Sequence, residues 1–197
     1  MIKTKLVLLG LLAVLLPSLF GCASSGPATQ YYSLFPAPLN ADYARSDKST
    51  SFGVGPVVLP EYLENSALVS LDSSHQLKLS GYRAWAGDLK SAISRVISTN
   101  LASLWQIDGV WSFPWDTRAR PDYQIRIVLD KFDGERGGTV SLLARWQIID
   151  QKQHKAIFVS SATLSRQTED DSVEAYVAAL NALLTQLSVR IAEESSI

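Results

Sequence analysis

Residues 123–130 read YQIRIVLD and residues 140–148 read VSLLARWQI, so that in each segment every second side chain is apolar. This alternation is typical of strands that turn one face to a core and the other to solvent. The loop between them contains DGERGG at residues 133–138, whose glycines suit a hairpin turn. A third long strand is predicted at residues 156–167, after a polar turn at 151–154. These segments predict that β-structure dominates the second half of the chain.

Two further segments carry apolar residues at helical spacing. A first helix is predicted from about residue 83 to residue 104, and a second helix near the end of the chain. The stripe positions are Leu89, Ile93, Val96, Ile97, Asn100, Leu101 and Leu104 in the first helix and Val173, Val177, Leu180, Leu184, Leu187 and Ile191 in the second. Ser80 fits the N-cap of the first helix, and Asp171 with Glu174 fits the start of the second. The predicted fold class is α+β: a largely antiparallel sheet with two long helices packed on one face.

Shorter strands are predicted at residues 31–34, 52–59 and 109–115, and residues 67–71 and 76–80 are expected to pair as a hairpin. Pro56 and Pro114 lie inside two of these strands. Because proline has no N–H to donate, both residues favour edge positions in a sheet. The glycines beside Pro56 also indicate a bulge or the close approach of another backbone.

The first 21 residues have the layout of a secretory signal peptide. Lys3 and Lys5 form a basic start, residues 6–16 form an apolar core, and Pro17 ends that core. The alternative is an uncleaved transmembrane helix, but such a helix needs about 20 apolar residues, and Pro17 interrupts this segment early. We therefore predict that the segment 1–21 is a signal peptide and is removed.

The segment Leu19-Phe20-Gly21-Cys22 resembles the lipobox of bacterial lipoproteins. It predicts cleavage between Gly21 and Cys22 and acylation of Cys22 with chains such as palmitate. Cys22 is the only cysteine, so the fold has no intramolecular disulfide to stabilise it. Residues 22–29 are small and polar and are predicted to form a lipidated tether, which leaves residues 30–197 as one domain. Ala23 stands where an aspartate would mark inner-membrane retention, so the outer membrane, on its periplasmic face, is the expected location.

The composition argues against several functions. With 18 Lys and Arg against 19 Asp and Glu, the chain has no basic stripe to bind phosphates, so nucleic acid is not an expected partner. No metal-ligand spacing, nucleophile elbow or phosphate loop is present, and no cofactor or catalytic residue is predicted. A hydrolase would require His75 or His154 in a cleft beside carboxylates, whereas both lie in predicted polar turns.

Trp111, Phe113 and Trp115 alternate along one predicted strand, which places three rings on one side of it. Core packing is one interpretation of this pattern. The other is a contact surface for a partner or a lipid, since exposed aromatic residues anchor interfaces and apolar ligands. Pro114 places the strand at an edge, where a partner strand could be added.

Several short segments, in their order and spacing, resemble one family over nearly the whole mature chain. They are Cys22 followed by residues 31–34 (YYSL), residues 54–59 (VGPVVL) running into 60–63 (PEYL), residues 83–86 (RAWA), and residues 122–127 (DYQIRI) leading to 132–134 (FDG). The chain is thereby similar to the ABC-type transport auxiliary lipoproteins, the group of paraquat-inducible protein C.

The resemblance implies a role without turnover. It implies that the protein is a docking component of an intermembrane lipid transport system, held in the membrane by its lipid anchor. The implied partners are a periplasm-spanning protein with mammalian-cell-entry (MCE) domains and an inner-membrane transport component. Because such partners form rings, a homo-oligomer is also expected. The alternative function is a lipid-binding module that itself carries an acyl chain. Trp111, Phe113 and Trp115 suggest this alternative, because exposed aromatic residues can contact apolar ligands.

Overall fold

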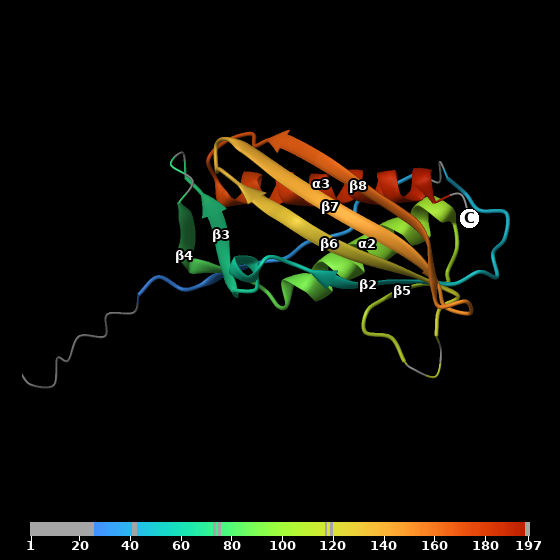
Figure 1. The fold of residues 1–197 in the computed structure, drawn as a ribbon. Helices are drawn as coiled ribbons and strands as arrows, with labels where there is room; N and C mark the ends of the chain where they lie inside the picture. The colour runs from blue at the N-terminus through green and yellow to red at the C-terminus, as the bar shows by residue number, and fades with distance from the viewer. Residues whose placement is uncertain are drawn as a thin grey trace, which may run out of the picture.

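The computed structural model describes residues 26–40, 43–72, 74, 76–116, 118 and 120–195. Gly21, Cys22 and the predicted signal peptide lie outside these residues, as does His75. The described chain contains a five-stranded sheet, a three-stranded sheet and two long helices (Figure 1). The predicted α+β class is confirmed.

The large sheet has the strand order β5-β2-β6-β7-β8. Its bounds are β2 Phe52–Val58, β5 Val110–Ser112, β6 Tyr123–Gly134, β7 Thr139–Asp150 and β8 Lys155–Gln167. The strands β6, β7 and β8 pair antiparallel through two hairpins, as their alternation predicts. The strand β2 runs parallel to both of its neighbours, so the sheet is mixed at this edge.

The alternation of β6 and β7 has the expected consequence for packing. The side chains of Ile125, Ile127, Leu142 and Ile148 are at most 1 % exposed and lie on the face covered by the helices. Arg126 and Arg145 occupy the opposite face, where Arg145 forms an ion pair of 2.8 Å with Asp130. Burial of the apolar face contributes roughly 25 cal/mol for each Å² removed from water, which stabilises this register.

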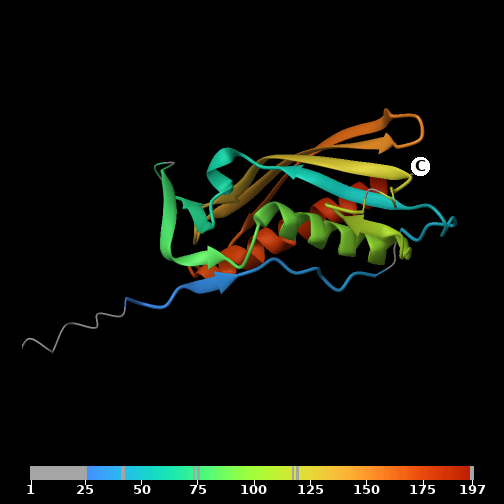
Figure 2. The ribbon, with the colours of Figure 1, turned by 90° about the horizontal axis from the view of Figure 1, so that it is seen from below.

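The helices α2 (Leu89–Trp105) and α3 (Val173–Glu194) lie side by side on one face of the sheet (Figure 2). The helix α2 contacts β2 and β5, whereas α3 contacts β7 and β8. Every apolar position of the two predicted stripes is buried. Asn100 is fully buried within the α2 stripe, and hydrogen bonds satisfy its side-chain amide. The amide oxygen accepts from the backbone N–H of Ala37, and the amide nitrogen donates to the Ser188 hydroxyl.

The predicted helix starts are corrected by the structure. The helix α2 begins at Leu89 rather than near residue 83, and its N-cap is Asp88, whose carboxylate accepts a bond of 2.8 Å from the N–H of Ser91. Likewise, Ser172 rather than Asp171 caps α3. The sequence signal was ambiguous because Ser80 and Asp88 both precede α2, and Asp171 and Ser172 are adjacent before α3, so only the chain path decides which residue takes the cap position.

A second, three-stranded sheet was not anticipated. It has the order β1-β4-β3, with bounds β1 Gln30–Tyr32, β3 Ala67–Leu71 and β4 Leu77–Trp85. The predicted antiparallel hairpin of β3 and β4 is confirmed. Residues 83–85, which the periodicity had assigned to the helix, instead pair in parallel with β1. The 3-10 helix η2 (Glu61–Leu63) connects β2 to this sheet.

The strand β2 departs from its predicted position. It lies between β5 and β6 rather than at an edge, although it contains Pro56. Its register shifts between Val54 and Val57, and this irregularity accommodates the proline that lacks a ladder donor. Gly55 has φ +119, a conformation that favours glycine, and its backbone closely approaches Phe113.

The helix α3 is long and apolar enough to cross a membrane by length and composition. In this fold it is a core helix: Leu180, Leu183, Leu184 and Ile191 are at most 1 % exposed and pack in the common core with the sheet and α2. The described chain is elongated, with the first described residues and the small sheet at one end (Figures 1 and 2). The strand β5 and the end of α3 lie at the other end.

Candidate docking site

The three aromatic residues of the sequence prediction lie in the edge strand of the large sheet or directly after it. Trp111 lies in β5, which pairs only with β2 and is an edge strand, as Pro114 predicts. The strand is shorter than expected and ends at Ser112, because Pro114 follows two positions later and has no N–H to continue the ladder. Trp111 and Trp115 are half-buried, whereas Phe113 is 43 % exposed.

The backbone of Phe113 is held by two neighbouring elements. Its N–H donates to the carbonyl oxygen of Val54 in β2 at 2.9 Å and to the hydroxyl of Ser94 in α2 at 3.1 Å. The Ser94 hydroxyl in turn donates to the same Val54 carbonyl at 2.6 Å. An exposed ring is therefore presented from a fixed backbone, so binding a partner there would order little additional chain.

The ring of Trp115 covers Gly53 of β2. A methyl group placed on Gly53 would lie 2.7 Å from the Trp115 ring and from Pro121, so this contact requires glycine. The rings of Phe113 and Trp115 meet edge to face, with centroids 5.3 Å apart. We call the surface formed by Trp111, Phe113 and Trp115 the aromatic edge. It combines the two sequence interpretations, because one side of the cluster packs on β2 and the other faces solvent.

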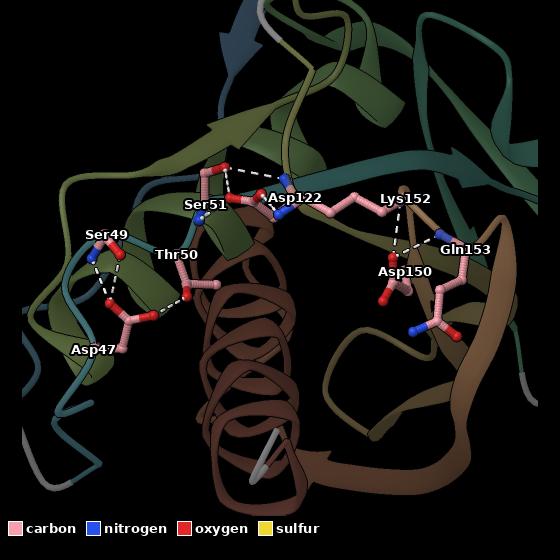
Figure 3. A network of polar contacts seen from close by, with 8 residues as sticks. All are labelled: Asp47, Ser49, Thr50, Ser51, Asp122, Asp150, Lys152 and Gln153. Atoms are coloured by element: carbon pink, nitrogen blue, oxygen red, sulfur yellow. Dashed lines mark hydrogen bonds and ion pairs between the residues drawn. The ribbon is translucent and has the colours of Figure 1, made fainter.

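A polar network fixes the loops that enter this part of the sheet (Figure 3). Ser51, just before β2, donates to the Asp122 carboxylate through its N–H at 3.1 Å and its hydroxyl at 2.7 Å. The N–H of Asp122, just before β6, donates back to the Ser51 hydroxyl at 3.0 Å. Lys152 forms an ion pair of 3.2 Å with Asp122. The network thereby closes the loop that begins at the aromatic edge.

A second carboxylate orders the approach to β2. Asp47 accepts the N–H and the hydroxyl of Ser49 at 2.8 and 2.7 Å, and the hydroxyl of Thr50 also donates to it. These hydrogen bonds lower the pKa of Asp47 to about 2, with the Thr50 hydroxyl as the largest cause. The pKa of Asp122 is lowered in the same way, chiefly by the Ser51 hydroxyl. Both groups are therefore charged at neutral pH and serve to hold loops.

Sequence reasoning missed this network. The Asp-x-Ser-Thr pattern at residues 47–50 is a signal for a turn in which the side chain accepts backbone and hydroxyl hydrogens. The pairing of Ser51 with Asp122 had no such signal, since 71 residues separate them. Only the parallel alignment of β2 and β6 brings the two together.

The opposite end of the domain is where the predicted tether joins the fold. The strand β1 follows the tether, and Leu34 just beyond it is fully buried. The Tyr32 hydroxyl donates to the Glu174 carboxylate at 2.7 Å, which raises the pKa of Tyr32 and lowers that of Glu174. Further along, the N–H of Phe35 donates to the side chain of Asn181 at 3.1 Å. The N-terminal segment is thus attached to α3 at two points.

Of the two histidines that a hydrolase would require, only His154 lies among the described residues. His154 lies in the exposed turn between β7 and β8, and no group of three His, Cys, Asp or Glu residues that could hold a metal occurs among the residues described. A hollow of about 300 Å³ beside β3 and β4 is lined by Leu79 together with the charged residues Asp72, Lys78 and Glu135. Its mixed lining differs from the apolar cavity that an acyl chain requires.

The sequence profile of the family described as the ABC-type transport auxiliary lipoprotein component matches residues 32–192. The chain belongs to this family. No curated protein matches the sequence. Among solved structures, an uncharacterized protein superposes with a TM-score of 0.67 at 23 % identity, covering 86 % of this chain and 100 % of the other. Protein XCC0632 from Xanthomonas campestris superposes with a TM-score of 0.62 at 14 % identity, covering 84 % of this chain and 90 % of its own. At these identities the structural likeness concerns the fold.

Proposed function

We propose that this protein is a lipid-anchored, non-enzymatic docking component of an intermembrane lipid transport system. In this proposal Cys22 carries the lipid, the outer membrane is the location, and the aromatic edge binds an MCE-domain protein. Membership of the ABC-type transport auxiliary lipoproteins supports a role beside an ABC transport system. The lipobox at residues 19–22 supports the anchor.

The observation that carries the proposal is the placement of the two ends. The chain enters the fold at the end formed by β1, β4 and β3, and the aromatic edge lies at the opposite end (Figures 1 and 2). An anchor at Cys22 holds the first end near the bilayer. The aromatic edge then faces away from that bilayer, where a protein reaching across the periplasm is accessible. Exposed aromatic residues on a rigid frame are the kind of group that dominates binding energy at interfaces.

A crosslinking experiment tests this partner. A photoreactive phenylalanine analogue replaces Phe113 in the full-length protein expressed in its native cell, and the same analogue replaces Val159 as the matched control. Val159 is 70 % exposed and lies on β8 at the other edge of the sheet. We expect irradiation to capture an MCE-domain protein, identified by mass spectrometry, from position 113 and not from position 159. Equal capture at both positions, or no MCE-domain protein at either, contradicts the proposal.

The membrane assignment has its own test. Ala23 follows the lipidated cysteine where aspartate would direct retention in the inner membrane. We expect the unaltered protein in the outer-membrane fraction of a density gradient and the Ala23→Asp variant in the inner-membrane fraction. The same distribution for both proteins would remove the basis for placing this protein in the outer membrane.

A lipid-carrying module is the second candidate function, and the half-buried rings of the aromatic edge are the reason for it. Phe113 and Trp115 contact each other and cover Gly53 and Gly55, so they fill the space beside β2. We therefore expect native mass spectrometry of the purified protein to show no phospholipid beyond the covalent anchor. A stoichiometric bound lipid would favour the second candidate over docking.

A further inference from the structure

The end of the domain that receives the tether has an unusual surface. Nine large apolar side chains are exposed among the described residues, and four of them lie on the short strands β1 and β4. They are Tyr31, Leu77, Leu79 and Tyr82, with exposed fractions of 68, 44, 55 and 52 %. We call these four residues the tether-end patch. Apolar groups gathered at one end of a folded domain usually mark a contact surface.

The pairing of β4 determines which face its exposed side chains occupy. Ala67 pairs with Ala84 and Val69 pairs with Leu79, and the register of β3 and β4 shifts between these two pairs. Ala67 and Val69 share one face of β3, and paired residues lie on the same face of a sheet, so Leu79 lies on the same face as Ala84. Tyr31 pairs with Ala84 in the register of β1 and β4 and shares that face. A bilayer presents one broad surface, so apolar side chains that share a face can contact it together.

The length of the tether decides how far the patch can be from the bilayer. The first described residue, Gly26, follows Cys22 by only four positions. Four residues span at most about 14 Å when fully extended. Gly26 lies beside Tyr82, since a methyl group placed on Gly26 would be 3.9 Å from the Tyr82 ring. A lipid on Cys22 therefore keeps Tyr82, and with it the part of the patch formed by β1 and the end of β4, close to the headgroups.

The chemistry of the patch suits a shallow position. Tyrosine combines an apolar ring with a hydroxyl and is enriched at membrane–water interfaces. Deep insertion is unfavourable, because β4 would bring backbone groups and charged Lys78 into hydrocarbon. The boundary between headgroups and acyl chains accepts the leucines and the tyrosine rings while the polar groups remain hydrated.

We infer that the tether-end patch contacts the glycerophospholipid surface in which Cys22 is anchored, so that the domain has a fixed orientation on the membrane. This inference rests on the proposed lipidation of Cys22. It adds a second membrane contact, made by Leu77, Leu79, Tyr31 and Tyr82, to the covalent one. The contact would orient the aromatic edge away from the bilayer.

The absence of other cysteines allows a direct test with the full-length lipidated protein. The thiol of Cys22 is blocked as a thioether in the lipidated form, so a cysteine introduced at another site is the only thiol available to a polarity-sensitive fluorophore. Leu79→Cys and Tyr82→Cys report on two parts of β4, one before and one after the pair Val69–Leu79 at which its register with β3 shifts. Val159→Cys is the matched control, since that residue is more exposed than either Leu79 or Tyr82 and lies on β8 of the other sheet. These positions are exposed, so the substitutions leave the core intact.

The labelled proteins are reconstituted in vesicles of phosphatidylethanolamine and phosphatidylglycerol, with and without nitroxide-labelled lipid. We expect blue-shifted emission at positions 79 and 82 and loss of most of that emission with the quencher lipid. At position 159 we expect neither change. If the protein floats with the vesicles but positions 79 and 82 remain unquenched, the inference is overturned, whereas the lipid anchor is retained. A blue shift without quenching also overturns it, because a protein surface, such as a second copy, would then cover the patch.

Flotation separates this inference from the proposed function. If the lipidated protein does not float with the vesicles, or if the Cys22 thiol itself takes up the fluorophore, the anchoring proposal fails and the contact that depends on it fails as well. If the protein floats, the quenching result concerns the patch alone.

Discussion

The two ends of the molecule carry aromatic residues in different ways. At the aromatic edge, Trp111 and Trp115 are half-buried and Trp115 covers Gly53, so the cluster is built into the large sheet. At the tether end, Tyr31 and Tyr82 extend from short strands and are more than half exposed. The first arrangement fixes ring positions, as specific protein recognition requires. The second leaves side chains free to adjust, as contact with a fluid surface allows.

The proposed function requires one small domain to contact a membrane and a protein, and the two ends of this molecule would keep those contacts apart. The long strands β6, β7 and β8 separate the two ends, and strands of 12 or 13 residues span about 40 Å. A contact at one end is thus too distant to interfere sterically with a contact at the other. Four predictions, from the largest expected effect to the smallest, test this division.

The largest effect concerns the anchor. We expect Cys22→Ser to abolish stable membrane attachment, because acyl chains contribute roughly 0.8 kcal/mol for each buried methylene and the tether-end patch is too small to replace them. Membrane fractionation of the whole cell lysate, followed by immunoblotting, measures the share of the protein that stays membrane-bound. Ser24→Ala in the same tether is the control. If the Cys22→Ser protein stays in the membrane fraction, the tether end binds through some other element.

The second prediction tests whether the tether end is an integral part of the fold. Leu34 is fully buried, so we expect Leu34→Ala to lower the free energy of unfolding by about 2 to 5 kcal/mol. The adjacent Phe35 is 64 % exposed, and Phe35→Ala should change the free energy of unfolding by less than about 0.5 kcal/mol. Urea denaturation followed by circular dichroism measures both. Equal effects would mean that the N-terminal segment does not dock as described.

The third prediction concerns the aromatic edge. Gly55 has φ +119, and a methyl group there would approach Phe113 to 2.6 Å. We expect Gly55→Ala to destabilise the protein by more than about 1 kcal/mol and to displace Phe113. Crosslinking to the partner from position 113 should fall accordingly. Gly87→Ala is the control, since no atom lies within 4 Å of the added methyl group and Gly87 has no positive φ. Similar losses from both variants would refute a specific role for the contact.

The smallest expected effect is the pH dependence of stability that comes from the carboxylates holding the loops, above all Asp47 before β2. The pKa of Asp47 is lowered from 3.8 to about 2 by hydrogen bonds, so its folded form favours the charged state. The stabilisation is fully present above pH about 4 and is lost as the pH falls towards 2. Asp47→Asn should remove this dependence in the loop that leads into β2. Asp72→Asn should remove the corresponding dependence beside β3 at the tether end, because hydrogen bonding also lowers the pKa of Asp72 to about 2.

Urea titrations at several pH values between about 2 and 5 measure this effect, with tryptophan fluorescence as the readout. Asp47 and Trp105 line the same hollow, so Asp47→Asn should alter the tryptophan fluorescence transition more than Asp72→Asn does. A pH profile unchanged by both variants would show that these carboxylates do not contribute to stability.

Much of the fold followed from local patterns. The alternation in residues 123–130 and 140–148 predicted β6 and β7, and the helical spacing near the end of the chain predicted α3. These predictions were confirmed because each depends on one periodicity over many residues. The start of α2 was wrong because residues 83–85 fit a helix and a strand equally well in sequence. Their pairing with β1, more than 50 positions away, decided the outcome.

The candidate surfaces were only partly foreseeable. Alternation placed Trp111, Phe113 and Trp115 together, but the sequence left core and surface both open. In the structure, Trp115 packs on Gly53 and Phe113 packs beside Gly55 of the neighbouring parallel strand, and these glycines set how closely the two residues approach. The tether-end patch had no signal in sequence, because Tyr31 and Tyr82 become neighbours only when β1 joins β4.

The sequence by itself determined the α+β class, the long hairpins, the helix stripes and the lipobox, because each of these depends on residues close together in the chain. The tertiary structure decided which face each aromatic side chain occupies, which carboxylates hold which loops, and that the tether and the aromatic edge lie at opposite ends. Those features depend on contacts between residues far apart in the chain, and the cost of closing such loops is recovered only when the whole core assembles.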